Sequence, residues 1–174
     1  MICSYVMASR RILQLGDPML RCISAPTDAA SAAPVFDDLR DTLHEFQRTH
    51  GFGRGISAVQ IGRPLRLIYI EFEGTAHAIR NPEFEFQSAS KFRLWDDCFS
   101  FPNLLVYLER SQSVRVRFAD AQGETRRIAA AGPLSELLQH EIDHLDGILA
   151  VDRALDRHSL ATREEYVRRF RTAQ

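Results

Sequence analysis

Apolar residues recur at helical spacing in the first third of the chain. The positions that share one helix face are Val35, Phe36, Leu39, Leu43 and Phe46. This period predicts an amphipathic helix over 35–50, and Gly51 is the residue type that commonly follows a helix end. The Ala- and Ser-rich stretch at 28–34 precedes this pattern, and we expect it to be a linker.

A second helical pattern covers the sequence GPLSELLQHEIDHLDG. Its apolar stripe is formed by Leu134, Leu137, Leu138 and Leu145. Pro133 suits a first helical turn and Gly147 suits the position beyond the end, which predicts a helix over 133–146. Nearer the C-terminus, the sequence TREE has the form of a capping box that begins at Thr162, and it predicts a short helix over 162–171.

Other apolar positions follow strand patterns. The stretch 65–72 is largely apolar, which predicts a buried strand, and 77–87 predicts two extended pieces around an Asn-Pro break. Apolar and polar residues alternate in 113–118, and a turn at 120–124 leads to the sequence TRRIAA, which predicts a hairpin. The fold class is therefore α+β, with small mixed or antiparallel sheets packed around a central helix over 133–146.

Composition narrows the possible classes of function. The chain has 174 residues, 45% of them hydrophobic and 26% charged, which predicts one domain over 1–174, with an N-terminal extension at 1–10 and a helical tail at 154–174. The net charge of −1 creates no global field for DNA, and no apolar run is long enough to span a membrane. We find no signal peptide pattern and expect a cytoplasmic location, with an organellar one left open; Met7 is an alternative start.

Candidate chemistry is concentrated in the sequence QHEIDHLDG on the second helix. His140 and His144 are four residues apart, so they lie on the same helix face and can bind one metal ion. Glu141 is close enough to act on a water at that ion. Two imidazoles and a glutamate base are typical of zinc hydrolases.

A catalytic metal usually has a third protein ligand. The other histidines (His44, His50, His77 and His158) are expected to be surface residues. Cys98 lies in the apolar sequence LWDDCFSFP, and its thiolate would be a strong ligand for Zn²⁺ or Fe²⁺. Asp96 and Asp97 are rival ligands. The three cysteines do not have the pattern of a disulfide framework.

Three segments of the chain together resemble the peptide deformylase family. The family motifs G-x-G-L-A-A-x-Q, E-G-C-L-S and Q-H-E-x-D-H-L-x-G correspond here to GRGISAVQ (53–60), DDCFS (96–100) and QHEIDHLDG (139–147). They occur in the family's order and spacing, and the likeness extends over about 11–153. The third motif is highly specific, while the second departs from the family pattern.

The resemblance implies a role for each matching residue. The implied metal ligands are Cys98, His140 and His144, and the ion would be Fe²⁺, with Zn²⁺, Ni²⁺ or Co²⁺ as alternatives. Glu141 would act as a general base and then as an acid. Gln60 and the backbone N–H of Phe99 would form an oxyanion hole. The residues expected beside the substrate peptide are Gly53, Arg54, Gly55, Asp97 and Glu136.

The implied activity is removal of the N-formyl group from the N-terminal methionine of newly made polypeptides, with release of formate. Two alternatives are a related metalloamidase or peptidase with another N-acyl substrate, and a non-catalytic deformylase-like binding protein. N-formylated nascent peptides are the expected partners. The C-terminal arginines allow either a transient ribosome contact or a solvated helix face.

The departures from the family pattern are mostly charged residues. Asp96 replaces the family's glutamate, and we expect it to form an ion pair with Arg110. Asp97 replaces a glycine. Together with Arg54 and Glu136, it would make the substrate pocket more polar than a methionine side chain favours.

Overall fold

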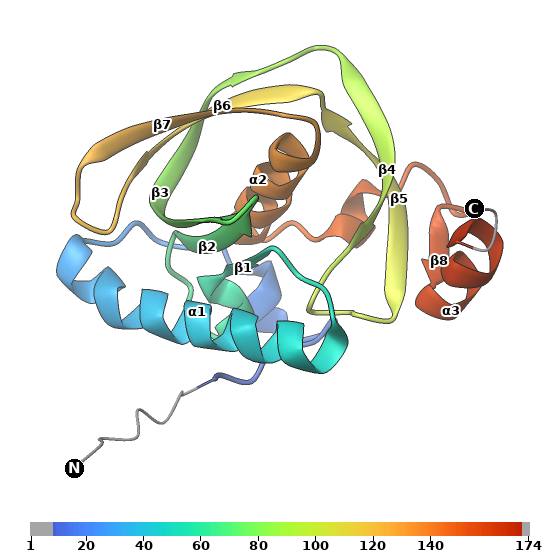
Figure 1. Ribbon diagram of the computed structural model, residues 1–174, viewed down its shortest axis with the longest axis horizontal. Coiled ribbons are helices and arrows are strands. Elements are labelled where there is room, and N and C mark those ends of the chain that lie inside the picture. Colours follow the sequence, from blue (N-terminus) through green and yellow to red (C-terminus); the bar gives the residue numbers. More distant parts are fainter. Residues whose placement is uncertain (1–8, 172–174) are drawn as a thin grey trace.

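The computed structural model describes residues 9–171 and contains two antiparallel sheets (Figure 1). In spatial order, the larger sheet consists of β1 (Gly55–Ser57), β2 (Leu67–Phe72), β3 (Thr75–Gln87), β6 (Ser113–Ala119) and β7 (Thr125–Ala131). The smaller sheet consists of β4 (Lys91–Asp97), β5 (Leu104–Ser111) and β8 (Leu160–Thr162). The predicted α+β class is confirmed, and the strand ladders are antiparallel.

The helices lie in separate parts of the molecule (Figure 1). They are α1 (Ala29–His50), α2 (Gly132–Leu145) and α3 (Arg163–Tyr166), which continues as a π-helical turn, η4 (Val167–Arg171). Short 3₁₀ turns are η1 (Pro18–Arg21), η2 (Ala58–Ile61) and η3 (Ala150–Arg153). Within residues 9–171, no helix is long and apolar enough to cross a membrane.

Helix α2 occupies the centre of the molecule, with the large sheet arching over it and α1 on the far side (Figure 1). Leu138, Ile142 and Leu145 pack with Ile68 and Val116 from the large sheet in one apolar cluster. A second cluster joins α1 to β1 and β2, and a third joins β5 to the 3₁₀ turns. Because every residue from 135 to 145 is buried, polar side chains on α2 need partners inside the protein.

The start of the first helix differs from the prediction. Residues 28–34 are not a linker, because α1 begins at Ala29. The side chain of Asp28 caps the helix by accepting a hydrogen bond from the backbone N–H of Ser31 at 2.8 Å. Alanine favours helix strongly, and the helix continues through Pro34, which lies inside it and has no N–H to donate to the carbonyl of Ala30. The capping aspartate was the signal that marked the true boundary.

The predicted strands are present, with one change. The stretch 77–87 lies within a single strand, β3, whose register shifts between Arg80 and Glu83. Asn81 adopts a positive φ of 51° at this shift, which explains why the Asn-Pro pair resembles a break. The hairpin of β6 and β7 and the helix α2 are confirmed. The expected extension at 1–10 and the alternative start at Met7 fall largely outside the described residues.

Candidate metal centre and catalytic cleft

Two segments bring three metal-binding atoms together. His140 and His144 lie one turn apart on α2, and their Nε2 atoms are 3.2 Å apart. Cys98 follows the end of β4, and its Sγ lies 3.2 Å from Nε2 of His144. The ligand atoms of all three residues lie within 4.8 Å of one another, and all three residues are buried. This group has the composition and spacing of a metal site.

Asp96 orients His140 through the ring nitrogen that does not face the metal site. Its Oδ2 atom lies 3.0 Å from Nδ1 of His140 and accepts a hydrogen bond from Arg110 at 3.1 Å. Burial raises the pKa of Asp96, but His140 and Arg110 outweigh this effect and lower the pKa to about 2. The ionised carboxylate therefore accepts a hydrogen bond from Nδ1–H of His140, which leaves the lone pair of Nε2 directed toward the metal site.

The expected ion pair between Asp96 and Arg110 is confirmed and extends further than predicted. Arg110, only 2% exposed, also donates to Asp143 on α2. Asp143 in turn accepts hydrogen bonds from Arg153, at 2.5 and 2.6 Å. This network ties β4, β5, α2 and η3 together behind the metal ligands. Asp143 and Arg153 were not predicted as functional residues, although both lie within the stretch that resembles the family.

The donor set fits a divalent cation. Burial and the neighbouring His140 lower the pKa of His144 well below its ordinary value, so its imidazole is available as a neutral ligand. Two imidazole Nε2 atoms at 3.2 Å, next to a thiol, make a soft site of the kind that Zn²⁺ and Fe²⁺ occupy. One carboxylate oxygen of Glu141, Oε2, is buried without a hydrogen-bond partner, as expected beside a site that binds a water.

The rival ligands are engaged elsewhere. Asp96, Glu136 and His140 also bring ligand atoms within 4.8 Å of one another. However, Oδ2 of Asp96 already interacts with His140 and Arg110, and Glu136 forms an ion pair with Arg54. Asp97 forms an ion pair with Arg163 at 2.7 Å. The remaining histidines (His44, His50, His77 and His158) are exposed or half-buried and do not belong to either group.

Gln60 is held with its amide nitrogen beside the thiol. Its Oε1 accepts hydrogen bonds from the backbone N–H of Ser57 at 2.9 Å and from the Ser57 hydroxyl at 3.1 Å. The Nε2 group is thereby turned toward Sγ of Cys98 at 3.6 Å and Oγ of Ser100 at 3.3 Å. Because Gln60 is only 1% exposed, its donor is fixed in position and has little contact with solvent.

Glu141 lies in a site where its charge is poorly solvated. Burial raises the pKa of Glu141 to about 7, so its carboxylate can exchange a proton near neutral pH. Strand β1 approaches the helix closely at Gly55, where a Cβ atom would lie 2.7 Å from Oε1 of Glu141 and 3.1 Å from Leu137. Glycine at this position therefore allows the strand edge and the carboxylate to share the cleft.

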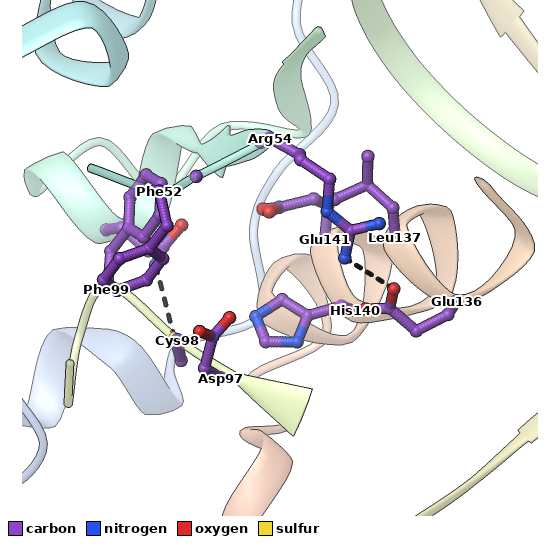
Figure 2. Close-up of a pocket in the computed structure, with 12 residues that line it drawn as sticks. Phe52, Arg54, Asp97, Cys98, Phe99, Glu136, Leu137, His140 and Glu141 are labelled. Atoms are coloured by element: carbon purple, nitrogen blue, oxygen red, sulfur yellow. Dashed lines mark hydrogen bonds and ion pairs between the residues drawn. The ribbon is translucent and has the colours of Figure 1, made fainter. Parts of the chain in front are cut away.

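These groups line a cleft with a cavity volume of about 260 Å³ (Figure 2). The predicted site residues that line it are Gly53, Arg54, Gly55, Gln60, Asp97, Cys98, Phe99, Glu136, His140 and Glu141. His144 lies behind them, nearly fully buried. Phe52 and Leu137 also line the cleft and were not predicted. Gly53 has a φ of 128°, and a Cβ there would lie 2.5 Å from the Phe99 ring.

The rim of the cleft carries two ion pairs. Arg54 donates to Glu136 at 2.7 Å, and Arg163 donates to Asp97 at the same distance. The Arg163 guanidinium also lies 4.1 Å above the Phe52 ring, a cation–π contact. Asp97 lies in β4 and is not among the residues with positive φ, so its replacement of a glycine needs no unusual backbone conformation.

Comparisons with known proteins agree with this geometry. Residues 9–159 match the model of the family described as polypeptide deformylase. A peptide deformylase from Bartonella tribocorum is 34% identical over an alignment of 174 residues. The alignment covers 95% of this chain and 93% of the relative.

Solved structures agree as well. A peptide deformylase from Legionella pneumophila superposes with a TM-score of 0.80 at 32% identity and covers 95% of each chain. The Met-Ala-Ser-bound enzyme from Acinetobacter baumannii superposes with a TM-score of 0.76 at 27% identity, over 84% of this chain and 99% of that one.

Proposed function

The chain belongs to the peptide deformylase family of hydrolases, and we propose that it removes the N-formyl group from the N-terminal methionine of newly made polypeptides. Water is consumed, the formyl C–N bond breaks, and the products are formate and a free amine. The observation that carries this proposal is the buried group of Cys98, His140 and His144, next to a free carboxylate oxygen of Glu141.

Cys98, His140 and His144 would hold one divalent ion. When bound, such an ion lowers the pKa of a coordinated water to about 7 and polarises a carbonyl group. The soft thiolate and two imidazoles fit Fe²⁺, which we propose as the native ion, and they also accept Zn²⁺, Ni²⁺ or Co²⁺. The Asp96 carboxylate strengthens His140 as a ligand by accepting a hydrogen bond from its Nδ1–H.

Glu141 would move the proton in both halves of the reaction. Its carboxylate accepts a proton from the attacking water as the new C–O bond forms, and it then donates that proton to the leaving nitrogen. A pKa of about 7 suits both roles. The unpartnered Oε2 atom is the one available to water.

Gln60 and Phe99 would stabilise the oxyanion that forms at the formyl oxygen. The Nε2 group of Gln60 is fixed beside Cys98 by the two hydrogen bonds from Ser57. The backbone N–H of Phe99 immediately follows the cysteine in the chain. Donors that are already oriented need no reorganisation when charge develops, which is the main advantage of an oxyanion hole.

The peptide would extend along strand β1. This strand is at the edge of the larger sheet, with β2 as its neighbour on one side, so its other edge can pair with a substrate backbone. Gly53, Arg54 and Gly55 would line the bound peptide. The Acinetobacter relative was solved with Met-Ala-Ser bound, which supports a short peptide as the ligand here.

We further propose a cytoplasmic enzyme that acts on nascent peptides. A transient ribosome contact through the C-terminal arginines remains a prediction. Among these arginines, Arg163 pairs with Asp97 and Arg168 with Glu165, so part of this charge is used within the chain.

The test is formate release by protein loaded with Fe²⁺, Ni²⁺ or Zn²⁺ under anaerobic conditions. Peptides that carry a formyl group should release formate, while acetylated peptides should release no acetate and unblocked peptides should remain uncleaved. Glu141→Ala should keep its metal and lose turnover by about 10²–10⁴-fold, whereas the exposed Glu165→Ala should behave as the parent. The proposal fails if folded, metal-loaded protein releases no formate from any formylated peptide.

A further inference from the structure

One wall of the cleft is formed by an ion pair. Arg54, which precedes β1, donates to Oε2 of Glu136 on α2 at 2.7 Å and to the carbonyl of Pro133 at 3.3 Å. The Glu136 side chain is 4% exposed and that of Arg54 is 42% exposed. Figure 2 shows this pair next to His140 and Leu137, across the cavity from Phe52 and Phe99.

The pair is expected to persist when a substrate enters. Among the described residues, Arg54 is the cation that forms an ion pair with Glu136. Moving Arg54 away would leave a buried carboxylate without that partner, which is strongly unfavourable. A substrate side chain that reaches this wall therefore meets both charges in place.

The proposed chemistry places the first side chain of the substrate at this wall. The formyl oxygen must point to Gln60 and the backbone N–H of Phe99, next to Cys98. The leaving nitrogen must point to Glu141, which lies beside Gly55 and Leu137. The first residue of the peptide is attached to that nitrogen, so its side chain lies on the Glu141 side of the cleft, where Arg54 and Glu136 form the wall (Figure 2).

On the premise of the deformylase activity, we propose that Arg54 and Glu136 select N-formyl peptides whose first side chain is neutral, has methionine's length and ends in a strong oxygen acceptor. The amide oxygen of glutamine and the sulfoxide oxygen of oxidised methionine both have this chemistry. The thioether of methionine is a weak acceptor. It would cover the donors of Arg54 without replacing their hydrogen bonds to water, which costs binding energy.

Charged side chains match this wall less well than neutral ones. A carboxylate would accept from Arg54 but would be repelled by Glu136 and Glu141, both of which line the same cavity. A lysine ammonium would be repelled by the Arg54 guanidinium, whose hydrogen bond to Glu136 already satisfies that carboxylate. A neutral acceptor hydrogen-bonds to Arg54 and adds no net charge beside the buried Glu136 carboxylate.

The experiment compares formylated tripeptides that differ in the first residue. The probes are formyl-Gln, formyl-methionine sulfoxide, formyl-Met and formyl-norleucine peptides, with formyl-Glu and formyl-Lys as charged controls. The metal-loaded parent should show kcat/KM about tenfold higher for the glutamine and sulfoxide peptides than for the methionine and norleucine peptides, since unmatched polar groups lower transition-state binding. The ratio of kcat/KM between the glutamine and sulfoxide peptides shows whether the amide oxygen or the sulfoxide oxygen is preferred.

A double variant makes the assignment specific. Arg54→Leu with Glu136→Leu replaces the pair by apolar side chains, a change that buried pairs often tolerate, and it should reverse the preference in favour of formyl-Met. The matched control, Arg93→Leu with Glu109→Leu, removes an exposed pair of similar length (2.8 Å) between β4 and β5 and should keep the parental preference.

The outcomes separate this inference from the proposed function. Formate release with formyl-Met or formyl-norleucine preferred by the parent overturns the inference and leaves the deformylase activity intact. No formate from any peptide overturns the activity. In that case, calorimetry can still compare the affinities of the protein for the unformylated Gln and Met tripeptides. Binding of the Gln peptide that is equal to or weaker than that of the Met peptide contradicts the inference.

Discussion

The two ends of the cleft differ in how far their side chains are exposed to solvent. At the metal end, Cys98, His140 and Asp96 are at most 6% exposed and are supported by buried hydrogen bonds. At the rim, Arg54, Asp97 and Arg163 are 30–42% exposed at their side chains. The comparison indicates that the groups that carry out the reaction are fixed by burial. Changes at the partly exposed pair of Asp97 and Arg163 are therefore expected to leave the metal end undisturbed.

The largest expected effect is a loss of folding stability when the buried ion pairs behind the metal ligands are broken. Arg110→Met leaves Asp96 and Asp143 without their shared partner, and breaking a buried ion pair in this way costs about 3–5 kcal/mol. Arg93→Met removes a cation from the neighbouring strand, where the pair is exposed, and should cost less than about 1 kcal/mol. Urea unfolding of both variants measures the difference; equal losses of stability would contradict the contrast between the two ends.

The second largest effect is expected on kcat, at a residue of the metal end whose replacement should leave the protein folded. Gln60→Ala removes a preorganised donor, so kcat should fall by about 10²–10³-fold while metal content is unchanged. Gln14→Ala is a suitable control, because its amide donates to the backbone carbonyl of Phe99 but Gln14 does not line the cleft. Steady-state formate release separates the two variants. A Gln60→Ala enzyme with parental kcat would remove this residue from the oxyanion hole.

The smallest effect is expected at the rim. Asp97→Gly restores the residue type found in the family motif and breaks the 2.7 Å pair with Arg163. Because both side chains are about one-third exposed, solvent screens the pair and stability should change by less than about 1 kcal/mol. The change should appear mainly in KM, since Asp97 lines the cleft. A collapse of kcat with unchanged KM would show that the rim belongs to the catalytic machinery.

The same contrast explains what the sequence could predict. His140, Glu141 and His144 lie within one helix, whose period and end signals are local, so their shared face follows from spacing alone. Cys98 was identified by its residue type and by the family resemblance, with Asp96 and Asp97 as open alternatives that only the three-dimensional contacts removed.

The ion pairs of the rim could not be predicted in the same way, although Arg54, Asp97 and Glu136 were expected beside the substrate. Arg54 and Glu136 are 82 residues apart, and Asp97 and Arg163 are 66 apart. Charged residues are normally solvated, and no local pattern identifies a partner at such a separation. Strands β1, β4, β5 and β8 were not predicted as elements. Of these, β1 and β8 have only three residues each, which is too few for a clear period. The smaller sheet of β4, β5 and β8 brings Arg163, the residue directly after β8, to the cleft.

Cobalt absorption of the loaded protein tests the ligand set most directly, because a thiolate bound to Co²⁺ gives a charge-transfer band that nitrogen and oxygen ligands do not. Parent protein and the Cys22→Ser control should bind about one cobalt ion per chain and show this band, since Cys22 is exposed and does not belong to the group of metal-binding residues. Cys98→Ser should lose the band. A band that survives in Cys98→Ser, or that is absent from the parent with cobalt bound, would contradict a metal centre built from Cys98, His140 and His144.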